Sequence, residues 1–270
     1  MTGIELLIPK KECSSGDTIS GTIMISSDTK VKFNRIYAVL RAEEYVRVIR
    51  GSRKHRRFFK EKRSHCEEEL ELSGPGSIGK EKMALPFQFV LPDSCPGSYY
   101  GMHGWIRYRV EAFLELQGTN KLNSTEELFV FVKSPSPSLQ SVATSINENA
   151  VDILKVELPS NGFILGENFD IRFWVANQAN IRGLRIEIIH REYVTPESII
   201  EDTRRSFSSW YAKKEDIRTD TWNEVELQSA SNWPQSFKTD LIKSQYILKV
   251  TLDIPWRFDK IVEMPIIAVP

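Results

Sequence analysis

The stretch that decides the fold is PFQFVLPDSCPGSYYGMHGWIRYRVEAFLEL, residues 86–116. Its first part alternates apolar and polar side chains with a period of two, which predicts a strand that ends at Pro92, a residue without a backbone donor. Pro96 and the glycines around it predict a long turn. The last part has one apolar face and one charged face, with Phe113 as the exception; the apolar positions are Ile106, Tyr108, Val110, Ala112, Leu114 and Leu116. This is the pattern of an antiparallel strand with one face on a core.

Strand patterns recur along most of the chain. Residues 1–26 predict two strands separated by a turn, and residues 33–49 are rich in β-branched and aromatic side chains, which favours a strand over a helix. Further strands are predicted at 121–132, 151–158, 169–176, 182–195, 222–228, 244–254 and 260–268. The best candidate for a helix is 207–218, which we expect to decorate a loop. The chain is therefore predicted to be all-β.

A change of composition predicts a domain boundary. Residues 133–150 are rich in Ser, Pro and Asn and contain few large apolar side chains. Such a stretch is typical of a linker between domains. We therefore expect a first domain at 1–134, a linker at 135–150 and a second domain at 151–270.

The two halves also resemble each other in sequence. Residues 16–19 match 166–169, residues 44–46 match 192–194, and residues 106–110 match 246–250. The three matches occur in the same order, as expected for two copies of one β-sandwich in which one copy has shorter loops. Chance similarity between two β-rich halves is the competing explanation.

Composition limits the kinds of partner and the compartment. With 270 residues, 41% hydrophobic and 27% charged, the chain is typical of a globular protein of one large or two ordinary domains. Lys+Arg and Asp+Glu both number 36, so no overall charge attracts nucleic acid or a membrane. There is no signal-peptide pattern and no apolar run of membrane-spanning length. Three widely spaced cysteines then predict free thiols in a reducing cytoplasm.

The most unusual stretch is RGSRKHRRFFKEKRSHC, residues 50–66. Nine Lys/Arg and one acid lie between positions 47 and 63, and four glutamates follow at 67, 68, 69 and 71. The pattern predicts a β-hairpin with a basic tip and an acidic return limb. In one interpretation the tip is a solvated loop whose charge these glutamates balance. In the other it binds an anionic partner, because Arg binds phosphate through two hydrogen bonds and neighbouring aromatic side chains can enter a lipid interface.

The candidate anion- and partner-binding residues are Arg53, Lys54, Arg56, Arg57, Phe58, Phe59, Lys60, Lys62 and Arg63, with Lys10 and Lys11 added if the first turn lies nearby. No motif predicts catalysis or a cofactor. Residues 74–79 fit G-x-G-x-x-G, but another strand follows where a dinucleotide site requires a helix. The histidines and cysteines lack metal-ligand spacing. We expect no enzyme, no metal, no cofactor and no nucleic-acid partner.

These motifs together resemble the arrestin family, closer to the α-arrestins and prokaryotic relatives than to the visual arrestins. The resemblance covers nearly the whole chain. It depends on the Phe-rich strand, the Pro-x-Ser-Tyr corner and the Ile-x-Tyr-x-Val strand of residues 86–116, and on further motifs at 16–21, 158–163, 166–167, 175–178, 246–250 and 262–266. It implies two tandem antiparallel, immunoglobulin-like β-sandwiches. The chain departs from the α-arrestins in having no Pro-Pro-x-Tyr motif, which puts recruitment of ubiquitin ligases in doubt.

The resemblance implies a non-enzymatic adaptor in protein trafficking or signalling. Its partners would be membrane-protein tails or phosphorylated or acidic segments, bound at the basic region or by strand addition to a sheet edge. An anionic membrane surface is a further partner that the basic tip could contact, which would make the protein peripheral to membranes. The alternative is a structural, oligomerising scaffold like the arrestin-like subunit of retromer or the bacterial sporulation-control proteins.

Overall fold

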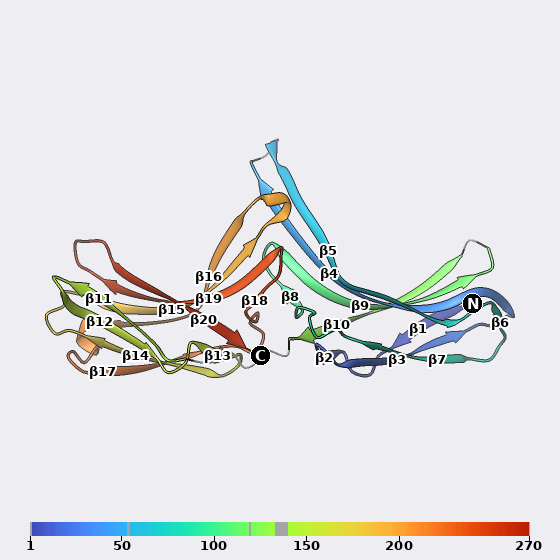
Figure 1. Cartoon of the computed structure of the whole chain (residues 1–270), viewed down its shortest axis with the longest axis horizontal. Helices are drawn as coiled ribbons and strands as arrows, with labels where there is room; N and C mark the ends of the chain where they lie inside the picture. The colour runs from blue at the N-terminus through green and yellow to red at the C-terminus, as the bar shows by residue number, and fades with distance from the viewer. Residues whose placement is uncertain (1, 53–54, 119, 133–139, 270) are drawn as a thin grey trace. The chain divides into compact units, whose positions relative to one another are not determined.

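The structure, a computed structural model, describes residues 2–52, 55–118, 120–132 and 140–269. Among these residues none lies in an α-helix, and the 3-10 helices are the short η2 (Pro196–Ser198) and η3 (Lys214–Asp216). The chain divides into two compact units, Met1–Lys133 and Ser134–Pro270 (Figure 1). Each unit contains two sheets, which confirms the predicted all-β fold of two sandwiches.

The first unit has a small and a large sheet. Its strands are β1 (Gly3–Leu7), β2 (Glu12–Ser14), β3 (Thr18–Ser26), β4 (Val31–Arg50), β5 (Arg57–Ser73), β6 (Gly76–Ile78), β7 (Met83–Val90), β8 (Tyr99–Tyr100), β9 (Gly104–Leu116) and β10 (Lys121–Phe131). The small sheet has the order β1-β3-β7. The large sheet has the order β2-β10-β9-β4-β5, with β6 paired to β4 and β8 to β9.

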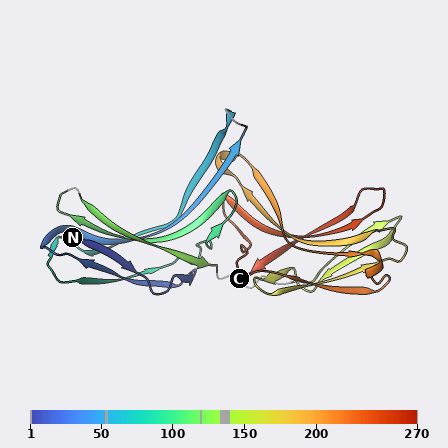
Figure 2. The same ribbon diagram turned by 180° about the vertical axis from the view of Figure 1, so that it is seen from behind.

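The second unit repeats this plan, as the view from behind also shows (Figure 2). Its strands are β11 (Val142–Glu148), β12 (Val151–Leu158), β13 (Gly162–Ile164), β14 (Asn168–Val175), β15 (Gly183–Val194), β16 (Glu201–Lys213), β17 (Trp222–Gln228), β18 (Phe237–Lys238), β19 (Ile242–Asp253) and β20 (Lys260–Val269). Its sheets have the orders β11-β12-β14-β17 and β13-β20-β19-β15-β16, with β18 paired to β19.

Strand β9 forms the centre of the first core. Ile106, Tyr108, Val110 and the later apolar positions of β9 up to Leu114 are fully buried. Phe113, an aromatic residue on the charged face, stacks on Tyr37 of β4 with ring centroids 5.0 Å apart. The alternation therefore identified both faces of the strand correctly.

The same hydrogen-bonded corner occurs in both units. The Tyr108 hydroxyl donates to the carbonyl of Pro96, and the Tyr246 hydroxyl donates to the carbonyl of Pro234 at 2.8 Å. In each unit a serine two residues after that proline accepts a backbone N–H at 2.9 Å, Ser98 from Val130 and Ser236 from Ala268. These two bonds satisfy the hydroxyls of the buried Tyr108 and Tyr246, which would otherwise be costly to bury. The repeat therefore extends to matching side-chain bonds. These bonds pair Tyr108 with Tyr246, so the sequence match of residues 106–110 to 246–250 is wrong by two residues.

Three sequence predictions need correction. Part of the predicted linker 135–150 is a strand, because residues 142–148 form β11 and pair with β12; residues 135–139 of that linker lie outside the described residues. The helix candidate 207–218 instead continues β16 to Lys213 and then forms η3. In both cases the segment is a strand because it pairs with a neighbouring strand. Such pairing depends on tertiary context, which the composition of the segment itself does not reveal. Residues 1–26 also contain three strands rather than two.

Candidate functional site: a basic hairpin

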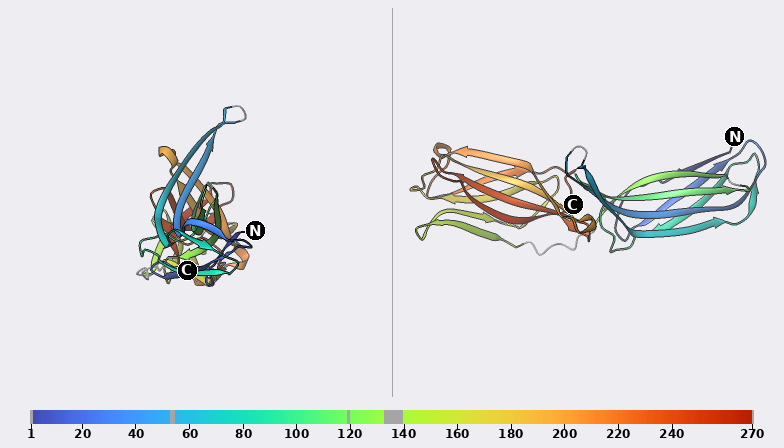
Figure 3. Two further views of the ribbon diagram at one scale, coloured as in Figure 1. Left: turned by 90° about the vertical axis from the view of Figure 1, so that its right-hand side faces the viewer. Right: turned by 90° about the horizontal axis from the view of Figure 1, so that it is seen from above.

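The predicted basic hairpin exists and extends beyond its sheet. Strands β4 and β5 pair as far as Arg50 opposite Arg57, whereas β9 accompanies β4 only as far as Val46. The last rungs, at 47–50 and 57–60, therefore have no third strand beside them, and Figure 3 shows this end of the hairpin protruding from the first unit. We call residues 47–63 the basic hairpin. Arg53 and Lys54, two predicted site residues, lie outside the described residues.

Its end places like charges opposite each other. Arg50 faces Arg57 across the two strands, and Arg47 faces Lys60. Directly opposite side chains lie about 5 Å apart at their Cβ atoms, and like charges in this position destabilise the pair. The hairpin therefore concentrates positive charge where strand pairing alone would favour its removal.

The glutamates of the return limb do not neutralise this end. Glu67 lies 3.2 Å from Arg41 and Glu69 lies 2.8 Å from Arg35, so both carboxylates pair with cations of β4 in the body of the sheet. The interpretation in which residues 67–71 balance the basic tip is therefore wrong, since the register places them opposite residues 37–41.

Nearer the tip, two other acids neutralise part of the charge. Glu43 pairs with Lys62 and with Arg109, the latter at 2.6 Å. Glu61 lies 3.1 Å from Arg63. Within the part of the chain that the structure describes, Arg56 and Arg57 have no ion-pair partner, and both are exposed. These two predicted site residues are thus available to an external anion.

Apolar side chains lie between the cations. Phe58 is 51% exposed and faces Ile49, which is 46% exposed. The Arg47 guanidinium lies over the Phe58 ring, 4.7 Å from its centroid. Phe59 is half-buried and Lys60 is exposed. The end of the hairpin therefore offers cations and an aromatic ring on one surface.

Lys10 and Lys11 are not part of this surface. They precede β2, and β2 and β5 are the opposite edges of the large sheet, four strand spacings or roughly 19 Å apart. Lys10 lies 3.8 Å from Asp17, and Lys11 pairs with Glu126. Lys10 and Lys11 were predicted to join the site if the first turn lies near the basic tip, and it does not. They lie instead next to another feature of the first unit.

That feature is the edge of the small sheet. Strand β1 pairs with β3 and forms the sheet edge, whereas its counterpart in the second unit, β12, is covered by β11. One backbone N–H on the outer side of β1, that of Leu6, donates to the Ser124 hydroxyl at 3.2 Å. Strand β10 therefore lies against this edge without pairing to it through backbone bonds.

The sequence-based prediction missed the β4 side of the hairpin. It placed the candidate residues at 53–63 and left out Arg47, Ile49 and Arg50, which the register brings opposite them. The signal was present, because counting outward from the turn in both directions pairs residue 50 with 57 and residue 47 with 60. The residues opposite a predicted hairpin limb should therefore be counted as part of the same candidate site.

The described residues bring no cluster of metal-ligating side chains together. They contain no group of three or more His, Cys, Asp or Glu that could hold a metal ion. The three cysteines are free, and burial raises the pKa of each thiol, which keeps it in its less reactive protonated form. No helix among the described residues is long and apolar enough to cross a membrane.

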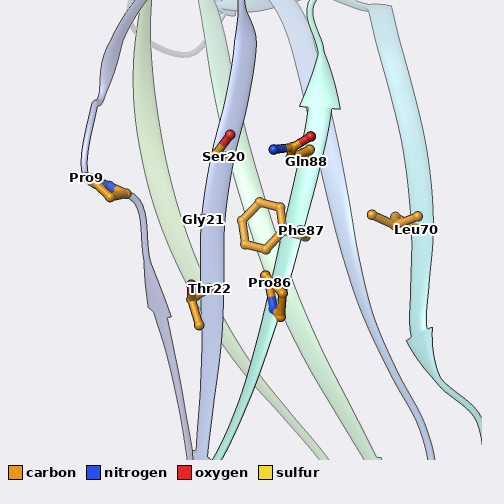
Figure 4. A pocket seen from close by; sticks show the side chains of 8 residues that line it. All are labelled: Pro9, Ser20, Gly21, Thr22, Leu70, Pro86, Phe87 and Gln88. Atoms are coloured by element: carbon orange, nitrogen blue, oxygen red, sulfur yellow. The ribbon is translucent and has the colours of Figure 1, made fainter.

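A hollow of about 670 Å³ in the first unit has no charged side chain among its described lining residues. The described residues that line it are uncharged: Pro9, Ser20, Gly21, Thr22, Leu70, Pro86, Phe87 and Gln88 (Figure 4). The Phe87 ring lies so close to Gly21 that a Cβ there would come within 2.4 Å of it. We interpret this glycine as a requirement of strand packing.

Comparison with known proteins identifies the family of the chain. Residues 4–135 match the family model of the arrestin (or S-antigen) N-terminal domain, and residues 153–269 match that of the arrestin (or S-antigen) C-terminal domain. The chain is also 27% identical over 203 residues to arrestin domain-containing protein 17 of Caenorhabditis elegans. That match covers 63% of this chain and 46% of the relative, so the chain corresponds to less than half of that protein's length.

Proposed function

Since the chain belongs to the arrestin family, whose members are generally non-enzymatic adaptors, we propose that it binds phosphorylated or acidic segments of protein partners through the basic hairpin of its first unit. The observation that supports this most is the pair of like-charge rungs, Arg50 with Arg57 and Arg47 with Lys60. An anion placed between such cations would remove their repulsion and so be bound more tightly than by isolated cations.

The side chains suit a phosphate or a carboxylate. A guanidinium can donate two parallel hydrogen bonds to either group, and charge-assisted bonds of this kind are about twice as strong as neutral ones. Arg56 and Arg57 have no ion pair to break among the described residues. The exposed Phe58 lies on the face of the hairpin that carries Arg47 and Lys60, where it can cover an apolar side chain of the same segment and add selectivity for sequence.

A second position for the partner segment is the edge of β1. In the second unit the strand that corresponds to β1 is β12, and β11 pairs with it in antiparallel fashion. Strand addition supplies backbone hydrogen bonds, and Lys10 and Lys11 follow directly after β1, where they would meet acidic side chains of the incoming strand. The two positions can be separated by mutation.

The test is binding of a doubly phosphorylated peptide and its unphosphorylated form, measured by fluorescence anisotropy at low and moderate salt. Arg50→Ser/Arg57→Ser removes one like-charge rung, and Lys80→Ser/Lys82→Ser removes the same charge from an exposed loop of the same unit. We expect the first variant to bind the phosphopeptide about tenfold more weakly, at about 1 kcal/mol or less for each cation. The loop variant should bind as the wild type does.

Equal binding by both variants would reject the hairpin as the site. Loss of binding in Lys10→Ser/Lys11→Ser alone would place the segment at the β1 edge instead. A preference of the wild type for anionic vesicles over the phosphopeptide, lost in Arg50→Ser/Arg57→Ser, would assign the hairpin to a membrane surface and reject the peptide proposal.

A further inference from the structure

Strand β5 is a long edge of the large sheet in the first unit. It is the last strand in the order β2-β10-β9-β4-β5. It has 17 residues, whereas the other strands at sheet edges in the described part of the chain have 13 or fewer. An edge strand exposes backbone N–H and C=O groups that can pair with another chain. An edge of this length therefore needs either a feature that prevents pairing or a strand that pairs with it.

The charges of β5 are sorted along its length. Basic side chains occupy its first part, where Glu61 is the one acid, and acidic side chains occupy its last part. The exposed members of the two groups are Lys60, Lys62, Arg63, Glu67, Glu68, Glu69 and Glu71. Charge on an edge strand normally prevents association, because two strands of the same sign repel. An antiparallel copy of β5 would instead place the basic part of each strand beside the acidic part of the other.

A bulge makes this arrangement compatible with the two faces of the sheet. The register passes from residues 42 and 66 to residues 43 and 64, which leaves His65 as an extra residue in β5. Even-numbered residues before the bulge and odd-numbered residues after it therefore lie opposite odd-numbered residues of β4, and they share one face. This outer face carries Lys60, Lys62, Glu67, Glu69 and Glu71, whereas Arg63, Glu68 and Leu70 lie on the other face.

One antiparallel register between two copies then places an acid opposite each of these three cations. If Lys62 lies opposite Glu69 of the second copy, the opposite residues have numbers that add to 131. The register therefore also pairs Lys60 with Glu71 and Arg63 with Glu68, and each pair consists of residues on the same face. Two-fold symmetry forms every contact twice. Opposite charges at directly opposite positions stabilise strand pairing, and no like charges face each other between residues 59 and 72 in this register.

The ion pairs that β5 already forms are compatible with these contacts. The Oε1 atom of Glu69 lies 2.8 Å from Arg35. An ionised carboxylate has two oxygens and about four acceptor positions, so Glu69 can bind a second cation from the other copy. Glu68 and Glu71 have no ion-pair partner among the residues that the structure describes. These two acids are thus available to cations of a second chain.

We propose that two copies of this chain associate by antiparallel pairing of their β5 edges over residues 59–72, so that their two large sheets form one continuous sheet. The partner on this surface is a second copy of the chain, selected by the charge pattern. The association does not depend on the proposed function. Because Lys60, Lys62 and Arg63 belong to both surfaces, the dimer would compete with an anionic segment for the basic hairpin.

The test is sedimentation velocity of the whole chain over a range of concentrations, at low and moderate salt and without any phosphopeptide. We expect a reversible dimer that weakens as salt rises. Glu68→Lys/Glu71→Lys places like charges opposite each other and should weaken the dimer at least about tenfold, and Lys60→Glu/Arg63→Glu should do the same. Glu81→Lys/Asp93→Lys makes the same change of charge at exposed positions outside β5. This matched control should dimerise as the wild type does.

The decisive sample is a mixture of the two β5 variants. Each variant repels its own copy, but every substituted residue of one variant lies opposite a residue of opposite charge in the other. A heterodimer should therefore form about as tightly as the wild-type dimer, which also shows that both variants are folded. A wild type that stays monomeric, a dimer that Glu68→Lys/Glu71→Lys leaves unchanged, or a mixture without heterodimer would each overturn the proposal. None of these outcomes bears on partner binding, because the peptide is absent.

Discussion

The buried histidine of the second unit should make that unit sensitive to acid. His190 is 7% exposed and packs against the rings of Phe207 and Tyr246, 5.1 and 5.0 Å away between centroids. Its Nε2 lies 2.9 Å from the Ser244 hydroxyl, which itself donates to the Gln235 carbonyl. The serine proton is thus engaged, so Nε2 carries a hydrogen and donates, and the ring is neutral with Nδ1 unprotonated.

Burial, helped by the charge of Arg205, lowers the pKa of His190 from 6.5 to about 4. Above pH 6.5 the imidazole is neutral in the folded and the unfolded chain, so it does not make stability depend on pH. Between pH 6.5 and 4 the unfolded chain binds a proton that the folded chain does not bind. The free energy of unfolding should then fall by about 1.4 kcal/mol for each pH unit, or about 3 kcal/mol over the whole range.

The assay is urea unfolding between pH 7.5 and 4.5, followed by tryptophan fluorescence. Five of the six tryptophans lie in the second unit, so the signal mainly reports its unfolding. His190→Gln keeps an N–H donor for Ser244 and cannot titrate. It should lower stability at pH 7.5, because ring stacking is lost, but its stability should fall less steeply with acid than that of the wild type. Parallel pH profiles for the two proteins would refute the reasoning.

Three further predictions concern the repeated corner, the small sheet and the basic hairpin. Tyr246→Phe removes the bond to the Pro234 carbonyl and should lower the free energy of unfolding of the second unit by about 1 kcal/mol, measured by urea titration. Gly21→Ala brings a Cβ within 2.8 Å of the Leu7 carbonyl as well as against Phe87, and should cost the first unit about 1–3 kcal/mol, seen as a lower unfolding temperature. Arg57→Glu turns a like-charge rung into an opposite-charge pair. Amide hydrogen exchange at 47–60 should then slow by about twofold or more, while phosphopeptide binding weakens. Unchanged exchange would contradict the repulsion inferred for this rung.

Local pattern was sufficient where one face of a strand meets a core and the other meets water. The alternation along residues 106–114 separated buried from exposed positions correctly, including Phe113 on the outer face. It was insufficient for β11, whose side chains are only half-buried on one side and exposed on the other. Such a strand leaves little hydrophobic contrast in its sequence and forms because β12 offers it an edge.

In the candidate site, too, some features follow from local sequence and others from the pairing of distant segments. Sequence identified the hairpin and its excess of cations, because both are properties of one contiguous segment. It could not say which acid neutralises which base. The register sends Glu67 and Glu69 to Arg41 and Arg35, so these acids lie away from the tip. The order of the large sheet, in turn, separates Lys10 and Lys11 from the hairpin.

The sequence by itself determined that this protein is a tandem repeat of two β-sandwiches with a basic hairpin in the first, because period-two patterning, turn residues and charge are encoded between near neighbours. Only the tertiary structure decided which cations remain opposite one another, which strand forms the edge of the small sheet, and that Trp256 and Phe258 contact almost nothing. These features depend on contacts between residues far apart in the chain, and one residue of register moves a side chain to the other face of its sheet.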